Sequence, residues 1–172
     1  MLIKLLLLAV LILIAYQDFK YREIHWALFL VIAVFFFIDG QTNMPFNKYL
    51  LNTLYNMIFV LLQFVFVYVF YLIRGHSFKS LFTNIIGVGD CLLISILTLA
   101  FSWHGFLLYY IGGLFFTLLI WLFVKNLKMA NNKLIPFAGL LSIYCVLLVI
   151  LEFFLPNYGR FGNESLKIFI YG

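Results

Sequence analysis

Residues 1–20 read MLIKLLLLAVLILIAYQDFK, and this stretch decides what kind of protein the chain can form. Between Met1 and Tyr16 the only charged side chain is Lys4, and about 20 apolar residues in a helix cross the hydrocarbon core of a bilayer. A cationic start also occurs in secretory signals, but Leu13 and Ala15 do not form the small-residue pair of a cleavage site. We therefore predict that residues 2–16 are retained as a first membrane-spanning helix.

The rest of the chain has the same character. Of its 172 residues 66% are hydrophobic and 10% are charged, whereas an ordinary soluble domain is about half apolar and a quarter charged. We predict an all-α integral membrane protein, a single bundle of six transmembrane helices over residues 1–172 with no soluble domain. The predicted spans lie near residues 2–16, 25–38, 50–73, 90–103, 105–125 and 134–155.

The loops between these segments predict the orientation. The loops after the first, third and fifth segments hold seven of the eleven Lys and Arg residues: Lys20, Arg22, Arg74, Lys79, Lys125, Lys128 and Lys133. Because positively charged loops stay on the cytoplasmic side, we expect these loops inside and both termini outside. The net charge of +5 therefore indicates topology rather than nucleic-acid binding.

A short amphipathic helix is predicted before the fourth span. In residues 76–87, HSFKSLFTNIIG, apolar side chains recur at helical spacing. Ser77 can cap the start, and Gly87 can end the helix in a left-handed conformation. Such a helix lies in the membrane interface and leads the chain to the sequence Gly-Val-Gly-Asp at residues 87–90.

The six acidic residues separate into two groups on this topology. Asp39 is expected in an outer loop, Glu152 near an outer helix end and Glu164 in the tail, while Glu23 is expected to pair with Arg22 in solvent. Asp18 and Asp90 remain, at the end of the first span and the start of the fourth, on the same side of the membrane.

Two carboxylates at one depth can meet across a bundle and share a proton. One then acts as a general base on water while its protonated partner polarises a carbonyl, as in aspartic proteases. Gly87 and Gly89 would leave backbone room for an extended substrate. The alternative is structural: a carboxylate at a helix end can lie in the headgroup region, and Asp is favourable near a helix N-terminus.

Three short motifs resemble a known family. GVGD at 87–90 matches the GxGD signature of intramembrane aspartyl proteases; DFKYREI at 18–24 and LIPFAGLL at 134–141 resemble the first-aspartate and Ile-Pro-Phe motifs of type IV prepilin peptidases. The resemblance covers almost the whole chain in order, spacing and number of spans. It implies a leader peptidase with Asp18 and Asp90 as catalytic aspartates, Gly87 and Gly89 shaping the active-site turn, and Pro136 fixing the neighbouring wall.

The same resemblance implies the setting of the reaction. The substrates would be pilin-like precursors of type IV pili or protein secretion, cut at the cytoplasmic face of the bacterial inner membrane. No metal, cofactor or nucleic acid is expected. Three positions depart from the family pattern: His25-Trp26 replace Pro-Asn, Leu92 replaces a frequent lysine, and Ala138-Gly139 replace Gly-Pro. The cysteine-containing extension that accompanies methyltransferase activity is not seen, so peptidase activity without methylation is expected.

Two other functions use the same acids. A proton-coupled small transporter would relay protons through them, and a non-catalytic assembly subunit would not need them. Asn52, Asn56 and Gln63 lie on one face of the third span, where interhelical hydrogen bonds are the expected role and a path for substrate or water is the alternative. Cys91 and Cys145 lie in apolar segments, with buried hydrophobic packing as the expected role.

Overall fold

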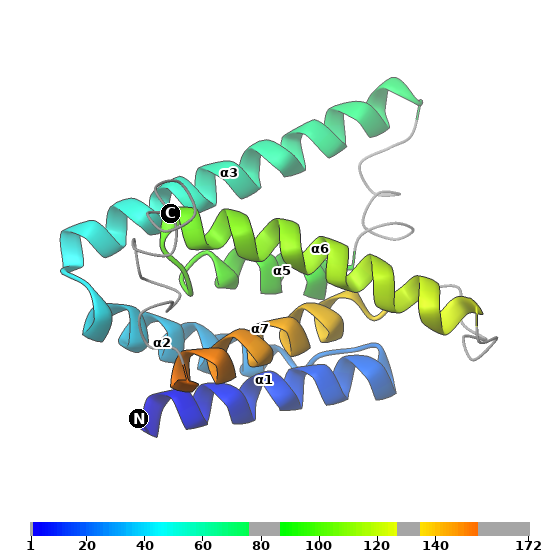
Figure 1. The fold of residues 1–172 in the computed structure, drawn as a ribbon. Coiled ribbons are helices and arrows are strands. Elements are labelled where there is room, and N and C mark those ends of the chain that lie inside the picture. Colours follow the sequence, from blue (N-terminus) through cyan, green and yellow to red (C-terminus); the bar gives the residue numbers. More distant parts are fainter. Residues whose placement is uncertain (1, 76–86, 127–134, 155–172) are drawn as a thin grey trace, which may run out of the picture.

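The computed structural model describes residues 2–75, 87–126 and 135–154. These residues form helices and no strand, so the all-α prediction is confirmed (Figure 1). The helices are α1 (Leu2–Tyr21), α2 (Trp26–Asn43), α3 (Phe46–Ile73), α5 (Val88–Leu97), α6 (Trp103–Asn126) and α7 (Phe137–Phe154). The predicted amphipathic helix over 77–86 lies outside the described residues.

Five of these helices, all except α5, are long and apolar enough to cross a membrane. α5 has 10 residues and is therefore about 15 Å long, half the thickness of a hydrocarbon core. The single helix predicted over 90–103 is wrong in extent, because α5 ends at Leu97 and a turn leads into α6 at Trp103. The two helices then run antiparallel to each other (Figure 1).

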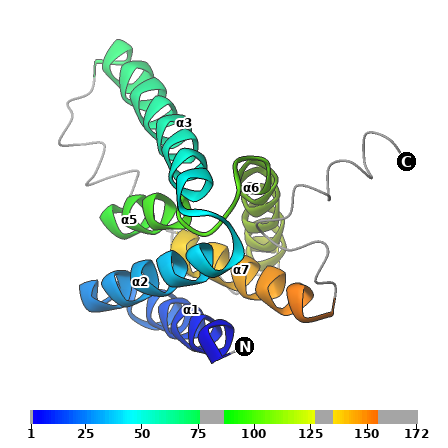
Figure 2. The same cartoon turned by 90° about the vertical axis from the view of Figure 1, so that its left-hand side faces the viewer.

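The core of the bundle is built on the first and last helices, which lie side by side (Figures 1 and 2). Leu7, Leu11 and Ile14 of α1 recur every three or four residues and are fully buried. On α7, Cys145 and Val149 are also fully buried. Cys145 therefore packs as a small hydrophobic residue, and it and Cys91 are free thiols.

The polar face of α3 holds the turn between α5 and α6. The side-chain amide of Asn56, which is fully buried, donates to the carbonyl oxygens of Thr98 and Phe101, both at 3.0 Å. The Asn52 side-chain oxygen accepts from the backbone N–H of Trp103 at 3.4 Å. Interhelical hydrogen bonding is thus confirmed for Asn52 and Asn56. These contacts satisfy carbonyls that the short α5 leaves without helical partners.

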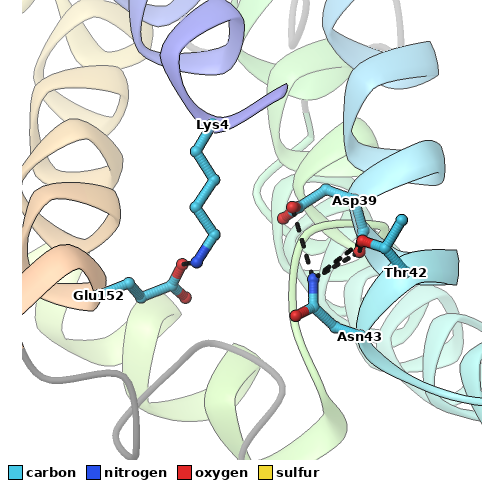
Figure 3. Close-up of polar contacts among 5 residues, drawn as sticks. All are labelled: Lys4, Asp39, Thr42, Asn43 and Glu152. Atoms are coloured by element: carbon cyan, nitrogen blue, oxygen red, sulfur yellow. Dashed lines mark hydrogen bonds and ion pairs between the residues drawn. The ribbon is translucent and has the colours of Figure 1, made fainter. Parts of the chain in front are cut away.

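The sequence predicted that Asp39 lies in an outer loop, and this prediction is wrong. It belongs to α2 and is only 3% exposed. The helix continues to Asn43 because side chains bond back to the carbonyl oxygen of Asp39: Thr42 Oγ1 donates at 2.8 Å and Asn43 Nδ2 at 2.6 Å (Figure 3). These bonds satisfy a backbone carbonyl in the last turn of the helix.

An ion pair joins α1 to α7 at the end of the bundle opposite Asp18. Lys4 Nζ lies 3.0 Å from Glu152 Oε2, and the Glu152 side chain is 5% exposed (Figure 3). Glu152 thus lies near the far end of the last helix, as expected from the sequence. The ammonium group also lies 5.9 Å from the centroid of the Phe153 ring.

We expect Lys4→Met to lower the free energy of unfolding by about 1–3 kcal/mol, because it leaves the buried carboxylate of Glu152 without the ammonium group, and the exposed part of Lys4 keeps the loss below that of a fully buried pair. The double variant Lys4→Met/Glu152→Leu is expected to recover most of this loss, since it removes the charge as well. Thermal or denaturant unfolding of the purified protein in detergent measures both. A double variant no more stable than Lys4→Met would contradict this interpretation of the pair.

Candidate functional site

Asp18 lies in the last turn of α1, which continues past the predicted end at residue 16 to Tyr21. Its side chain is 7% exposed, and Oδ2 accepts a hydrogen bond from the backbone N–H of Gly139 at 2.6 Å. The next residue, Arg22, ends the helix: it adopts a left-handed conformation with φ 60° and donates its N–H to the Asp18 carbonyl at 3.1 Å. Because α1 ends only after Tyr21, Asp18 lies within its last turn.

Asp90 is the third residue of α5. Gly87 precedes the helix with φ −66° and ψ 138°, so the left-handed conformation predicted for Gly87 is wrong. Asp90 Oδ1 accepts a hydrogen bond from the backbone N–H of Ala138 at 3.0 Å. The position also suits a carboxylate, because the first turn of a helix favours negative charge.

Both aspartates therefore bind consecutive amides in the first turn of α7. Pro136 immediately precedes this helix and offers no hydrogen-bonding side chain, so the first N–H groups of the helix need partners from elsewhere. Backbone bond lengths limit consecutive amide nitrogens to about 4 Å, and hence the two bonded oxygens to about 10 Å. The structure thus brings together Asp18 and Asp90, 72 positions apart, as the sequence predicted.

Close packing of glycines shapes this arrangement. A Cβ atom on Gly139 would lie 3.0 Å from Asp18 Oδ2 and 3.1 Å from Phe19 Cε2, and one on Gly87 would lie 2.9 Å from Asp90 Oδ2. A Cβ atom on Gly89 would make only ordinary contacts, at 3.8 Å. Within the fold, a side chain at Gly87 would crowd only the Asp90 carboxyl group and one at Gly89 would crowd nothing, so the backbone room for a substrate at both glycines stays a prediction. The sequence did not predict that Gly139 belongs to the site. The signal that could have found it is that α7 starts directly after a proline without a capping side chain, so that its first N–H groups need partners.

A cavity of about 1500 Å³ opens beside the two aspartates, and both side chains line it. Most of its wall is apolar and comes from α2, α3, α5 and α6. Its polar lining residues are Asp18, Arg22, Glu23, Gln63 and Asp90. The cavity therefore combines a hydrophobic chamber with a pair of carboxylates, a combination suited to acid–base chemistry on a largely apolar ligand.

The residues between α1 and α2 differ from expectation. Among the described residues no ion pair joins Glu23 to Arg22. His25, which stands at a position where the resembled family often has proline, caps α2: its Nδ1 accepts from the Ala27 N–H at 3.3 Å. The His25 N–H in turn donates to Gln17 Oε1 at 2.9 Å. His25 thus has a structural role next to the site.

Comparisons with known proteins do not assign a function to this arrangement. No protein-family model matches the chain, and neither does a curated protein or a solved structure. Asp18, Asp90 and the cavity are therefore interpreted from their geometry and from the sequence motifs.

Proposed function

We propose that the chain is a membrane aspartyl endopeptidase that removes the leader peptide from type IV pilin-like precursors. One observation supports this most: carboxylates from two distant helices, Asp18 and Asp90, accept hydrogen bonds from consecutive amides of α7 and line one apolar cavity. A purely structural cap of α7 could use both carboxylates, but it would not need the cavity that they line. The motif resemblance around both aspartates supports the same function.

In the proposed reaction, one carboxylate takes a proton from a water molecule, and the water oxygen attacks the carbonyl carbon of the scissile peptide bond. The protonated partner donates a hydrogen bond to the carbonyl oxygen. The C–N bond then breaks, and the amine leaves with a proton. The positive N-terminal end of α7 holds both carboxyl groups in place, through Ala138 for Asp90 and Gly139 for Asp18.

The proposal includes a topology of six crossings. α5 and the turn at residues 98–102 would make the fourth crossing, with local thinning of the bilayer compensating for the short helix. The ends of α1 and α3 and the start of α5 adjoin the loops that hold most of the Lys and Arg residues, so the site would face the cytoplasm. Residues 77–86 would form the interfacial helix that leads into α5.

The cavity would receive the substrate from the membrane. Its apolar wall suits the hydrophobic helix of a precursor, and the dyad lies where the leader would join that helix. Leu92 lines the cavity at 45% exposure, at a position where the resembled family often has lysine. This departure makes the wall less charged, so the accepted precursors would differ from those of relatives with lysine.

Co-expression with a precursor that carries a basic leader, a glycine and an apolar helix tests the function. We expect leader removal with the wild-type chain, visible as a shorter product with a new N-terminus, and an intact precursor with Asp90→Ala. Equal processing with both chains would assign the cleavage to another enzyme of the host and contradict the proposal.

A further inference from the structure

The C-terminal half of α3 forms one wall of the cavity. Phe59, Gln63 and Phe66 line it at spacings of four and three residues, which places them on one face of the helix. The buried residues of α3 extend no farther than Val60, just past the middle of the helix. Beyond this point α3 diverges from the other helices (Figures 1 and 2). On this face Phe59 still packs against rings of α6, whereas Gln63 and Phe66 lie farther along the helix and line the cavity.

Gln63 differs from the other two amides on this face. The side chains of Asn52 and Asn56 bind the turn between α5 and α6. Among the described residues, by contrast, none forms a hydrogen bond with the half-buried side chain of Gln63. An amide in a mainly apolar cavity gains from a hydrogen-bonding partner, and a ligand that enters the cavity can supply one.

The size, walls and charges of the cavity indicate which kind of ligand supplies a hydrogen-bonding partner for Gln63. At about 1500 Å³ it exceeds the usual 300–1,000 Å³ of small-molecule sites, and its walls are mainly apolar. Near the dyad the cavity is lined by Asp18, Asp90, Glu23 and Arg22; with one proton shared in the dyad, two negative charges stand against one positive charge. This balance complements a positive charge. An apolar helix with a cationic flank fits both features, and because its backbone is satisfied internally, only a side chain can bind Gln63.

We propose that Gln63 is a specificity-determining residue whose amide forms a hydrogen bond with a polar side chain on the apolar helix of the substrate. This inference rests on the proposed function, because it takes the ligand to be a membrane-spanning precursor. It predicts that accepted precursors carry one hydrogen-bonding side chain in the part of the helix that faces α3. Precursors without such a residue bind through apolar contacts alone.

Binding to the inactive double variant Asp18→Asn/Asp90→Asn tests the inference without requiring cleavage. The probes are synthetic precursors with a basic leader, a glycine and an apolar helix in which a single Asn is moved through successive positions. We expect positions on one helical face to bind about 3- to 10-fold more tightly than the probe without Asn, as one hydrogen bond in an apolar setting allows. Adding Gln63→Leu to the double variant is expected to remove this preference.

Two controls separate recognition from folding. Gln63→Asn keeps the amide on a shorter stem and is expected to retain part of the preference. Leu61→Gln introduces an amide on α3 at a 60% exposed position that does not line the cavity, and it is expected to leave the preference unchanged. Gln63→Leu itself is expected to unfold at or above the parent temperature, because it removes an amide without a partner.

The outcomes distinguish this inference from the proposed function. Failure of the wild-type chain to cut the probe without Asn contradicts the peptidase function. A uniform affinity across the Asn positions, or a preference that survives Gln63→Leu, overturns the role of Gln63 even if the probe is cut.

Discussion

Replacing either aspartate by asparagine, Asp18→Asn or Asp90→Asn, is expected to lower the rate of precursor cleavage by about 10²- to 10⁴-fold. An amide cannot take a proton from the attacking water, and it cannot pass a proton between substrate and dyad as a carboxyl group does. The side-chain oxygen of asparagine can still accept the hydrogen bond from Ala138 or Gly139, so the first turn of α7 remains capped. The loss should therefore appear in kcat rather than in folding.

Asp39→Asn is the matched control, because Asp39 is as buried as Asp18 but does not line the cavity. Its cleavage rate is expected to stay within about 2-fold of wild type, as for a change remote from the reacting groups. Cleavage by purified protein in detergent, followed over time on a gel, gives all three rates. A wild-type rate for Asp18→Asn or Asp90→Asn would show that the dyad is not catalytic.

Valine at Gly139 is expected to reduce both activity and stability. The added Cβ alone would lie within 3.2 Å of three atoms of Asp18 and Phe19, so α1 must move away from α7. Overpacking of this kind costs about 1–3 kcal/mol, and a shift of about 1 Å in a catalytic group can lower the rate about 10²-fold. Unfolding in detergent and precursor cleavage measure the two effects on one preparation.

Gly87→Ala and Gly89→Ala provide a graded comparison for this prediction. At Gly87 the new Cβ would crowd only the carboxyl group of Asp90, at 2.9 Å from Oδ2, so we expect lower activity with little change in stability. At Gly89 the new contacts are ordinary, and alanine is expected to be tolerated. Equal activity in the variants at Gly139, Gly87 and Gly89 would contradict the packing described for the site.

Much of the fold follows from patterns that act locally along the chain. The apolar segments predict the helices, because backbone groups in lipid must be satisfied within each segment. Asp18 and Asp90 could be placed at one end of the bundle because each follows or precedes such a segment. The hydrogen-bonding role of Asn52 and Asn56 also follows from their shared face on α3. For these features, the apolar segments and the helical spacing of the polar residues are enough to make the prediction.

Other features depend on partners that are distant in sequence. The extent of α5 could not be predicted, because the turn after Leu97 is held by Asn56 from another helix. The continuation of α2 past Asp39 could not be predicted either, because the side chains of Thr42 and Asn43 bond back to the carbonyl oxygen of Asp39. The dyad itself is positioned by backbone amides of α7; the sequence indicates that these amides need partners, because the helix starts after Pro136 without a capping side chain, but not which partners they find.

The mass of a precursor after incubation with the purified protein tests the central claim most directly. For the wild-type chain we predict two products, the leader and the mature protein, whose masses together equal that of the precursor plus one water molecule. For the double variant Asp18→Asn/Asp90→Asn we predict an unchanged precursor. Two products from the double variant, or an unchanged precursor with the wild-type chain, would contradict the assignment of this site as an aspartyl peptidase.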